Sequence, residues 1–238
     1  MRSSAHTSNR TTNRGASARK WPRTIAVFDF DGTLTRYDTY LRYLILSTLA
    51  RLTRLTHMGT LPIDVLRHKL GWQDNSWLKQ RFLSAILGGW GDTDLAIVTG
   101  RLFTELLNNG FRAEGLAELE RHRRLGHRTV LLSAGFDFYL APIANQMGFS
   151  DCICSNAERN EHGVLTGRIA GANCYGMEKV RRIKAILDCD LDLRYLVVYG
   201  DHETDFPLMR IADEAYIINP RPTLARKAEE IGIRILRW

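Results

Sequence analysis

The sequence lacks any long apolar run and any pair of cysteines with the usual zinc-ligand spacing. No stretch approaches the ~18 apolar residues that a membrane-spanning helix needs, and no apolar segment of the secretory-signal type is present. The cysteines are Cys152, Cys154, Cys174 and Cys189, and the closest pair, one residue apart, is too tight for a zinc knuckle. We therefore expect reduced thiols in a cytoplasmic protein.

Acidic residues are missing from positions 1–24, and this segment carries most of the basic excess of the chain. The formal net charge is +7, and the segment contributes Arg2, Arg10, Arg14, Arg19, Lys20 and Arg23 to it. The rest of the chain is almost neutral, so we expect no nucleic-acid partner. We interpret residues 1–22 as a disordered basic tail, because they are polar and have no apolar run. An organelle transit peptide and a mis-assigned start codon are the alternatives.

Strand and helix patterns divide the remaining chain into two kinds of region. An uncharged run at 24–28 predicts a buried parallel strand. Only helical patterns follow, at 40–55, 63–70, 76–87, 92–107 and 113–125. Strands are then expected at 128–132, 151–155, 195–199 and 215–218, with helices between and after them and a hairpin at 159–168. This alternation predicts an α/β fold with a Rossmann-like, doubly wound parallel sheet.

We accordingly expect a catalytic core formed by residues 23–38 and 126–238, split by an all-helical cap at 39–125. Ligands of such sheets bind at the carboxyl ends of the strands. Because the cap is inserted directly after the first strand, it would lie above those ends and could act as a lid.

Four aspartates are expected to meet at these strand ends. Asp29 and Asp31 follow the first strand and are two residues apart, which places both carboxylates on one side of an extended chain. Asp201 follows the strand at 195–199, and Asp205 lies about one helical turn further. Carboxylates so close repel one another unless a cation shares the site. Magnesium, which prefers oxygen ligands, would relieve that repulsion.

Two further residues could bind a phosphate beside this metal site. Ser133 follows the strand at 128–132 and offers a hydroxyl, and Lys179 near the start of a helix offers a positive charge. A metal site next to a phosphate site is what phosphoryl transfer requires.

In order along the chain, these residues resemble the four motifs of haloacid dehalogenase (HAD) superfamily phosphatases. The motifs are Asp29-Phe30-Asp31-Gly32-Thr33-Leu34-Thr35, then Ser133, then Lys179, then Gly200-Asp201-xxx-Asp205. The helical insert after the first motif resembles the cap of the phosphoserine phosphatase branch, subfamily IB. The resemblance covers roughly residues 25–220.

The resemblance implies a role for each motif residue. Asp29 is the nucleophile, and Asp31 is the general acid and base. Mg²⁺ is held by Asp29, by the main-chain carbonyl of Asp31 and by Asp201. Asp205 supports the metal or orients Lys179, and Ser133 and Lys179 bind the phosphoryl oxygens.

The same resemblance points to a small phosphorylated metabolite, with phosphoserine as the leading candidate. Asp38 stands where relatives have a Glu that holds the substrate amine, and Arg81 aligns roughly with an Arg that holds its carboxylate. Two positions depart from the phosphoserine pattern, because Gly32 replaces a Ser and Thr204 replaces an Asn.

Other functions stay open at this point. The helix expected at 40–55 is unusually apolar, which is compatible with peripheral membrane contact and with a lipid-phosphate phosphatase of the phosphatidylglycerophosphatase type. An aspartyl-phosphate could also be passed to an alcohol rather than to water. A non-catalytic regulator is disfavoured, because a binding module needs no nucleophile. The oligomeric state is left open.

Overall fold

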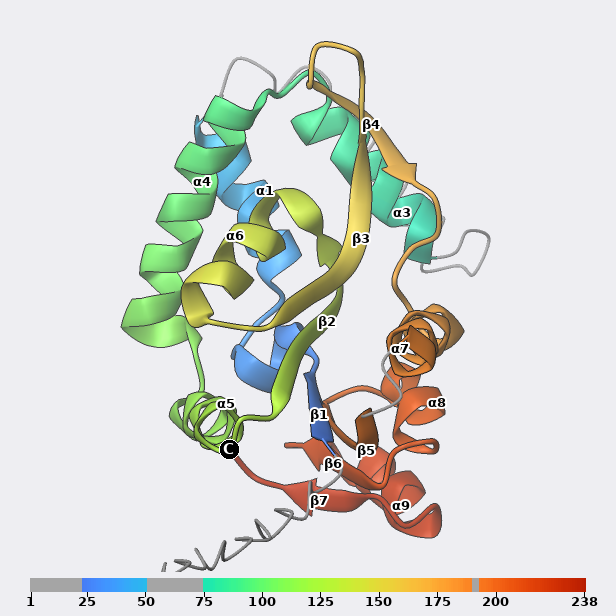
Figure 1. Cartoon of the computed structure of the whole chain (residues 1–238). Helices are drawn as coiled ribbons and strands as arrows, with labels where there is room; N and C mark the ends of the chain where they lie inside the picture. The colour runs from blue at the N-terminus through green and yellow to red at the C-terminus, as the bar shows by residue number, and fades with distance from the viewer. Residues whose placement is uncertain (1–22, 51–74, 190–192) are drawn as a thin grey trace, which may run out of the picture.

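A computed structural model describes residues 23–50, 75–189 and 193–238 of the chain (Figure 1). Its strands are β1 (Arg23–Phe28), β2 (Arg128–Phe136), β3 (Asp151–Arg159), β4 (Leu165–Ala170), β5 (Leu193–Gly200), β6 (Glu214–Ile218) and β7 (Arg234–Leu236). Its helices are α1 (Thr39–Ala50), α3 (Asn75–Phe82), α4 (Asp92–Glu105), α5 (Ala113–Arg124), α6 (Asp137–Met147), α7 (Met177–Cys189), α8 (Phe206–Met209) and α9 (Pro222–Glu230). The expected tail at 1–22 and helix at 63–70 lie outside the described residues.

The strands form one sheet in the order β4-β3-β2-β1-β5-β6-β7. All neighbours are parallel except β3 and β4, which form the expected antiparallel hairpin. The predicted α/β core with a doubly wound sheet is therefore confirmed. The short edge strand β7 was not predicted.

Alternation along β1 explains why this strand occupies the centre. Ala26 and Phe28 point into one hydrophobic core, whereas Ile25 and Val27 point into another. Helices α5 and α6 lie on one side of the sheet, and α7, α8 and α9 lie on the other (Figure 1). A strand buried on both faces has to be apolar at every position, as this run is.

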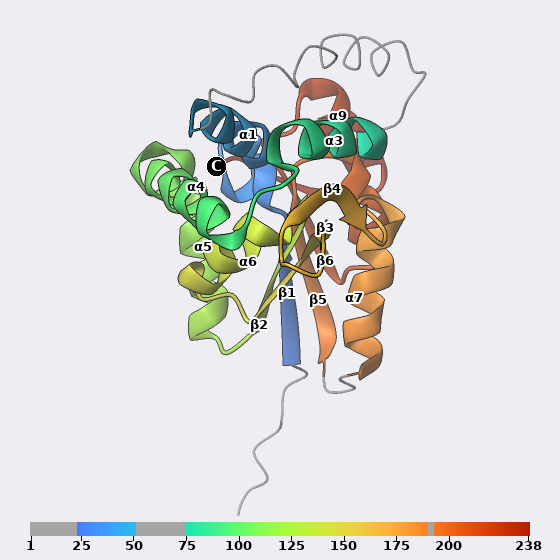
Figure 2. The same cartoon turned by 90° about the horizontal axis from the view of Figure 1, so that it is seen from above.

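The inserted helices lie at the carboxyl end of the central strands. Figure 2 shows α1 and α3 at the end of the sheet opposite the point where β1 begins. The segment after α3 is hydrogen-bonded to the hairpin, because Gly89 N donates to Leu165 O at 2.7 Å and Leu165 N donates to Trp90 O at 2.9 Å. The insert is thereby fixed to the core through β4 as well as through its own chain connections.

Helix α5 packs against β2 rather than over the strand ends. Its buried His122 makes an edge contact with Phe28 of β1. This contact favours a core that resumes before α5. The cap limit at residue 125 is a prediction from the sequence alone. Within residues 23–50, 75–189 and 193–238, no helix combines the length and apolar character that crossing a membrane requires.

Candidate active site

The turn after β1 brings the first motif against the end of β5. Asp29 N donates to Tyr199 O at 2.9 Å, which ties the turn to the neighbouring strand. Gly32 has a φ of +77°, a conformation that L side chains rarely adopt. A Cβ at this position would lie 2.0 Å from Oδ2 of Asp201. Glycine is therefore needed both for the turn and for the close approach of the Asp201 carboxylate.

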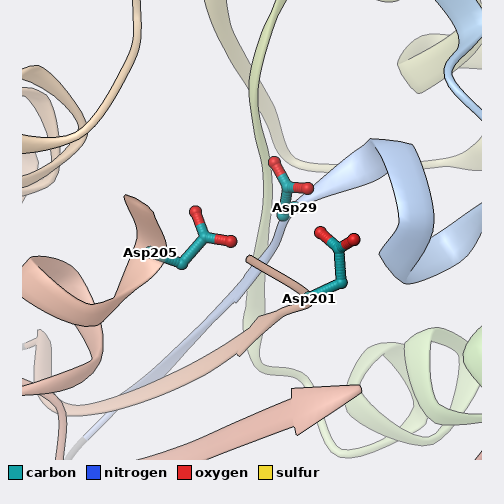
Figure 3. Close-up of side chains that lie close together, drawn as sticks. All are labelled: Asp29, Asp201 and Asp205. Atoms are coloured by element: carbon teal, nitrogen blue, oxygen red, sulfur yellow. The ribbon is translucent and has the colours of Figure 1, made fainter. Parts of the chain in front are cut away.

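Three carboxylates converge at the strand ends, as Figure 3 shows. Asp29 follows β1, Asp201 follows β5, and Asp205 lies in the short turn before α8. One oxygen from each lies within 4.8 Å of the others. Burial, followed by the neighbouring charges of Asp29 and Asp205, raises the pKa of Asp201 to about 8. A set of hard oxygen donors that repel one another in this way fits Mg²⁺.

Lys179 lies between two of these acids. Its buried ammonium donates to Oδ1 of Asp29 and to Oδ1 of Asp205, both at 2.7 Å. Burial alone would lower the pKa of Lys179, but the two carboxylates raise it well above its usual value. The lysine is therefore charged, and one role expected of Asp205, orienting Lys179, agrees with this geometry. Nearby Arg181 and Arg182 bind Glu178 instead.

The Asp31 carboxylate is held apart from this group. Its Oδ1 accepts a hydrogen bond from the backbone N of Thr39 at 2.7 Å and another from the Thr39 hydroxyl at 2.6 Å. Burial raises the pKa of Asp31 to about 7, with Asp38 as the next cause. Its Oδ1 is thus directed to the start of the cap, and Asp31 is not one of the three acids that converge.

Ser133 lies in an irregular part of β2. Pairing with β3 is interrupted between Leu132 and Phe136, and α6 starts only at Asp137. Within the interruption, Ser133 Oγ accepts a hydrogen bond from Gly135 N at 2.9 Å. Ser133 lines a cavity of about 410 Å³ together with Asp29, Asp31, Lys179, Asp201 and Asp205. The structure thus brings together all the core residues expected from the motifs.

The two residues expected to bind substrate are placed differently. Asp38 lines this cavity and also a neighbouring one of about 240 Å³. Its Oδ1 accepts from Leu41 N at 2.8 Å and so caps α1. Arg81 is in α3 but lines neither cavity.

The wall of the smaller cavity includes a buried lysine, Lys79, that was not predicted from the sequence. The cavity is lined mainly by apolar and aromatic side chains of the cap. A signal was available, because Lys79 shares a helical face with Leu83 and Ile86, which are buried. A lysine on the apolar face of a helix needs partners inside the protein. His202 lines the larger cavity, and its ring nitrogen caps the following turn by accepting from Thr204 N.

Together, the fold and the site define an α/β enzyme with a phosphoryl-transfer site at the carboxyl ends of its strands. The chain belongs to the haloacid dehalogenase-like hydrolase family, whose model matches residues 26–210. It is similar to Protein CicA of Caulobacter vibrioides (28% identity over 195 residues, 80% of this chain and 83% of the relative). It is also similar to a histidinol-phosphatase of Neisseria meningitidis serogroup C (23% over 233 residues, 91% and 99%).

Among solved structures, a substrate-bound phosphoserine phosphatase shares the fold. The TM-score is 0.64 at 17% identity, over 90% of this chain and 92% of that one. The expected membership of the HAD superfamily is confirmed, and the likeness to phosphoserine phosphatases is a likeness of fold.

Proposed function

We propose that the protein is a magnesium-dependent phosphomonoester hydrolase that works through an aspartyl-phosphate on Asp29. The observation that carries the proposal is the position of the Asp29 carboxylate. It lies against the charged Lys179 on one side and within 4.8 Å of the Asp201 and Asp205 oxygens. An electrophile with several anionic oxygens could be neutralised there by the lysine and by Mg²⁺.

The reaction divides into two displacements at phosphorus. In the first, an Asp29 oxygen forms a bond to phosphorus, the ester P–O bond breaks, and Asp31 gives its proton to the leaving oxygen. In the second, Asp31 takes a proton from water, the water oxygen bonds to phosphorus, and the bond to Asp29 breaks. Asp31 suits both steps because its side chain is held by Thr39 at the side of the site that faces the cap.

Lys179 and Ser133 would bind the phosphoryl oxygens. The Ser133 hydroxyl accepts a hydrogen bond from Gly135 N, so its own hydrogen is left to donate to phosphate. Asp29, Asp201 and the Asp31 carbonyl would hold Mg²⁺, which when bound supplies charge neutralisation of the phosphoryl group.

The cavities support a small leaving group that bears an amine. Asp38 uses one carboxylate oxygen to cap α1, which leaves the other for an ammonium group. Tyr40, Leu44 and Phe82 offer an apolar wall beside it. Phosphoserine would need Arg81 as a carboxylate ligand, whereas Arg81 lines neither cavity in the structure. Histidinol phosphate, which has an amine and no carboxylate, is the other candidate and is favoured by the name of one relative.

A panel of substrates separates these possibilities. The purified protein would be assayed with Mg²⁺ on phosphoserine, histidinol phosphate, phosphoethanolamine and p-nitrophenyl phosphate. Asp38→Asn should raise KM for the three amines and leave p-nitrophenyl phosphate nearly unchanged. Arg81→Ala should raise KM for phosphoserine alone if the carboxylate assignment holds. No hydrolysis of any phosphomonoester would contradict the proposed function.

A lipid phosphate is the second candidate, because α1 exposes an apolar stripe. Leu41 is 54% exposed, Ile45 42% and Leu49 62%, and Leu41 also lines the smaller cavity. If a lipid is the substrate, Ile45→Gln should reduce activity on phospholipid vesicles and not on soluble esters. Ile97→Gln in α4, at a position 52% exposed, is the matched control. Equal activities of both variants on vesicles would remove this candidate.

The proposed location is the cytoplasm. Cys152, Cys154, Cys174 and Cys189 are all free. Free thiols support a reducing compartment.

A further inference from the structure

The ammonium group of Lys79 connects the cap to three separate segments of the core. Lys79 belongs to α3 and is 8% exposed. Its Nζ donates to the carbonyl oxygen of Ala134 in β2, to Oδ1 of Asn173 at 2.9 Å and to Oγ of Ser155 at 3.3 Å. A second contact reinforces the connection, since Nδ2 of Asn173 donates to Oγ of Ser76 in α3 at 3.0 Å.

The three acceptors are neutral, so the charge of Lys79 is buried without an ion pair in the described part of the chain. The face of the Phe136 ring lies 4.1 Å from Nζ and adds a cation–π contact. Burial lowers the pKa of Lys79 to about 8. The nearest titratable groups, Cys174, Asp31, Cys154 and Asp38, oppose that shift. A methionine at position 79 would avoid this desolvation cost, which indicates that the charge is kept for a functional reason.

The Ala134 carbonyl is the contact that reaches the phosphate site. It belongs to the same planar peptide unit as the N–H of Gly135, and the two groups point in opposite directions. Fixing the direction of the carbonyl therefore fixes the direction of the N–H. That N–H is the donor to Ser133 Oγ at 2.9 Å. A chain of contacts runs from Lys79, through one peptide plane, to the serine hydroxyl.

We propose that Lys79 is a positioning residue, which locks α3 onto the core and orients the Ser133 hydroxyl for phosphate. The proposal rests on the proposed function, because it assumes that Ser133 binds a phosphoryl oxygen. When the cap is closed, the ammonium has a hydrogen for each of its three acceptors. If α3 moves away, the Ala134 peptide loses this restraint. The Ser155 hydroxyl also donates to the Ala134 carbonyl at 3.0 Å, so cap closure strengthens a restraint that the core itself begins.

The experiment compares Lys79→Met with Lys184→Met, an exposed lysine of α7. Both are assayed on p-nitrophenyl phosphate and phosphoserine, and inorganic phosphate is used as an inhibitor. Lys79→Met should lose about 10²-fold in kcat/KM on both substrates and bind phosphate more weakly, with Tm retained. Lys184→Met should match the wild type. A loss on phosphoserine alone would overturn the proposal and make Lys79 a ligand of the substrate carboxylate.

A second variant covers the case in which Lys79→Met does not fold. Loss of the Asp31 proton should give wild type and variant alike one alkaline fall near pH 7. Neutral lysine has two hydrogens for three acceptors, so the wild type should show a further fall near pH 8, which Lys79→Arg, keeping its charge, should lack. Superimposable alkaline limbs would contradict the proposal. An inactive wild type would overturn the proposed function and the positioning role together, whereas an active wild type with an equally active Lys79→Met overturns only the latter.

Discussion

Oδ1 of Asp29 lies 2.7 Å from the ammonium nitrogen of Lys179. The same ammonium lies 2.7 Å from Asp205, so the lysine is fixed from two sides. An incoming phosphate therefore meets a charged donor directly beside the nucleophile, with no need for the site to rearrange.

Replacing Lys179 by Met should reduce kcat/KM by about 10²–10³-fold, because one donor to the developing phosphoryl charge is lost. Lys227→Met is the matched control, since Lys227 is exposed and pairs with Glu203 at the surface. Steady-state kinetics on p-nitrophenyl phosphate measures both. Equal activities of the two variants would remove Lys179 from the phosphate site.

Magnesium should be needed for activity and should also stabilise the fold. Chelation is expected to abolish hydrolysis, and Mg²⁺ to restore it. A ligand that binds only the folded state raises Tm. Mg²⁺ would in addition relieve the repulsion among Asp29, Asp201 and Asp205. Thermal melts with and without Mg²⁺ show this independently of turnover. Asp201→Asn should lose most of the shift. Full activity after exhaustive chelation would contradict the metal assignment.

Gly32→Ala should abolish activity, because the added Cβ would collide with the Asp201 carboxylate. Gly126→Ala separates this collision from backbone strain, since Gly126 has a φ of +69° and open space around its Cβ position. Each variant should lose about 1–2 kcal/mol of stability from the left-handed conformation. Only Gly32→Ala should lose turnover and the Mg²⁺-dependent rise in Tm. A fully active Gly32→Ala would show that the close approach is dispensable.

Stability should fall in mild acid partly through His122, which is buried between α5 and the sheet. Burial lowers its pKa to about 4, with Arg121 as the next cause, from an ordinary value of 6.5. Between those values the unfolded chain binds a proton that the folded protein does not. His122 therefore reduces stability as the pH falls from 6.5 toward 4, by at most about 1.4 kcal/mol per pH unit.

Urea unfolding at several pH values tests this. The difference in unfolding free energy between the wild type and His122→Gln should decrease as the pH falls through that window. His162→Gln, in the exposed turn of the hairpin, should run parallel to the wild type. A pH-independent difference for His122→Gln would show that the imidazole is not kept neutral by the fold.

The core and its motif residues could be predicted because their signals are local. An uncharged strand followed by Asp29 and Asp31 specifies a turn at a strand end, and Asp201 repeats that pattern after β5. Parallel strands bring their carboxyl ends to one edge, so the residues had to meet. The need for Gly32 beside Asp201 depends on a distance between strands, which spacing along the chain does not contain.

The cap was harder to predict, because its contacts are tertiary. Lys79 was not singled out from the sequence, and Arg81 was chosen by alignment with relatives. The helical face that Lys79 shares with Leu83 and Ile86 indicates an inward side chain, and its hydrogen bonds to Ala134 of β2 and Ser155 of β3 show it. The helical pattern of α5 was likewise recognised, although its packing against β2 was not.

Covalent phosphorylation of Asp29 tests the central claim most directly. Asp31→Asn should slow release of the intermediate by about 10²–10⁴-fold, so phosphoenzyme should accumulate in acid-quenched reactions with Mg²⁺ and p-nitrophenyl phosphate. Peptide mass spectrometry should then find one phosphoryl group on the peptide that contains Asp29, removable by hydroxylamine. The double variant Asp29→Asn/Asp31→Asn should carry none. Phosphate on that double variant, or on another residue of the single variant, would contradict the account.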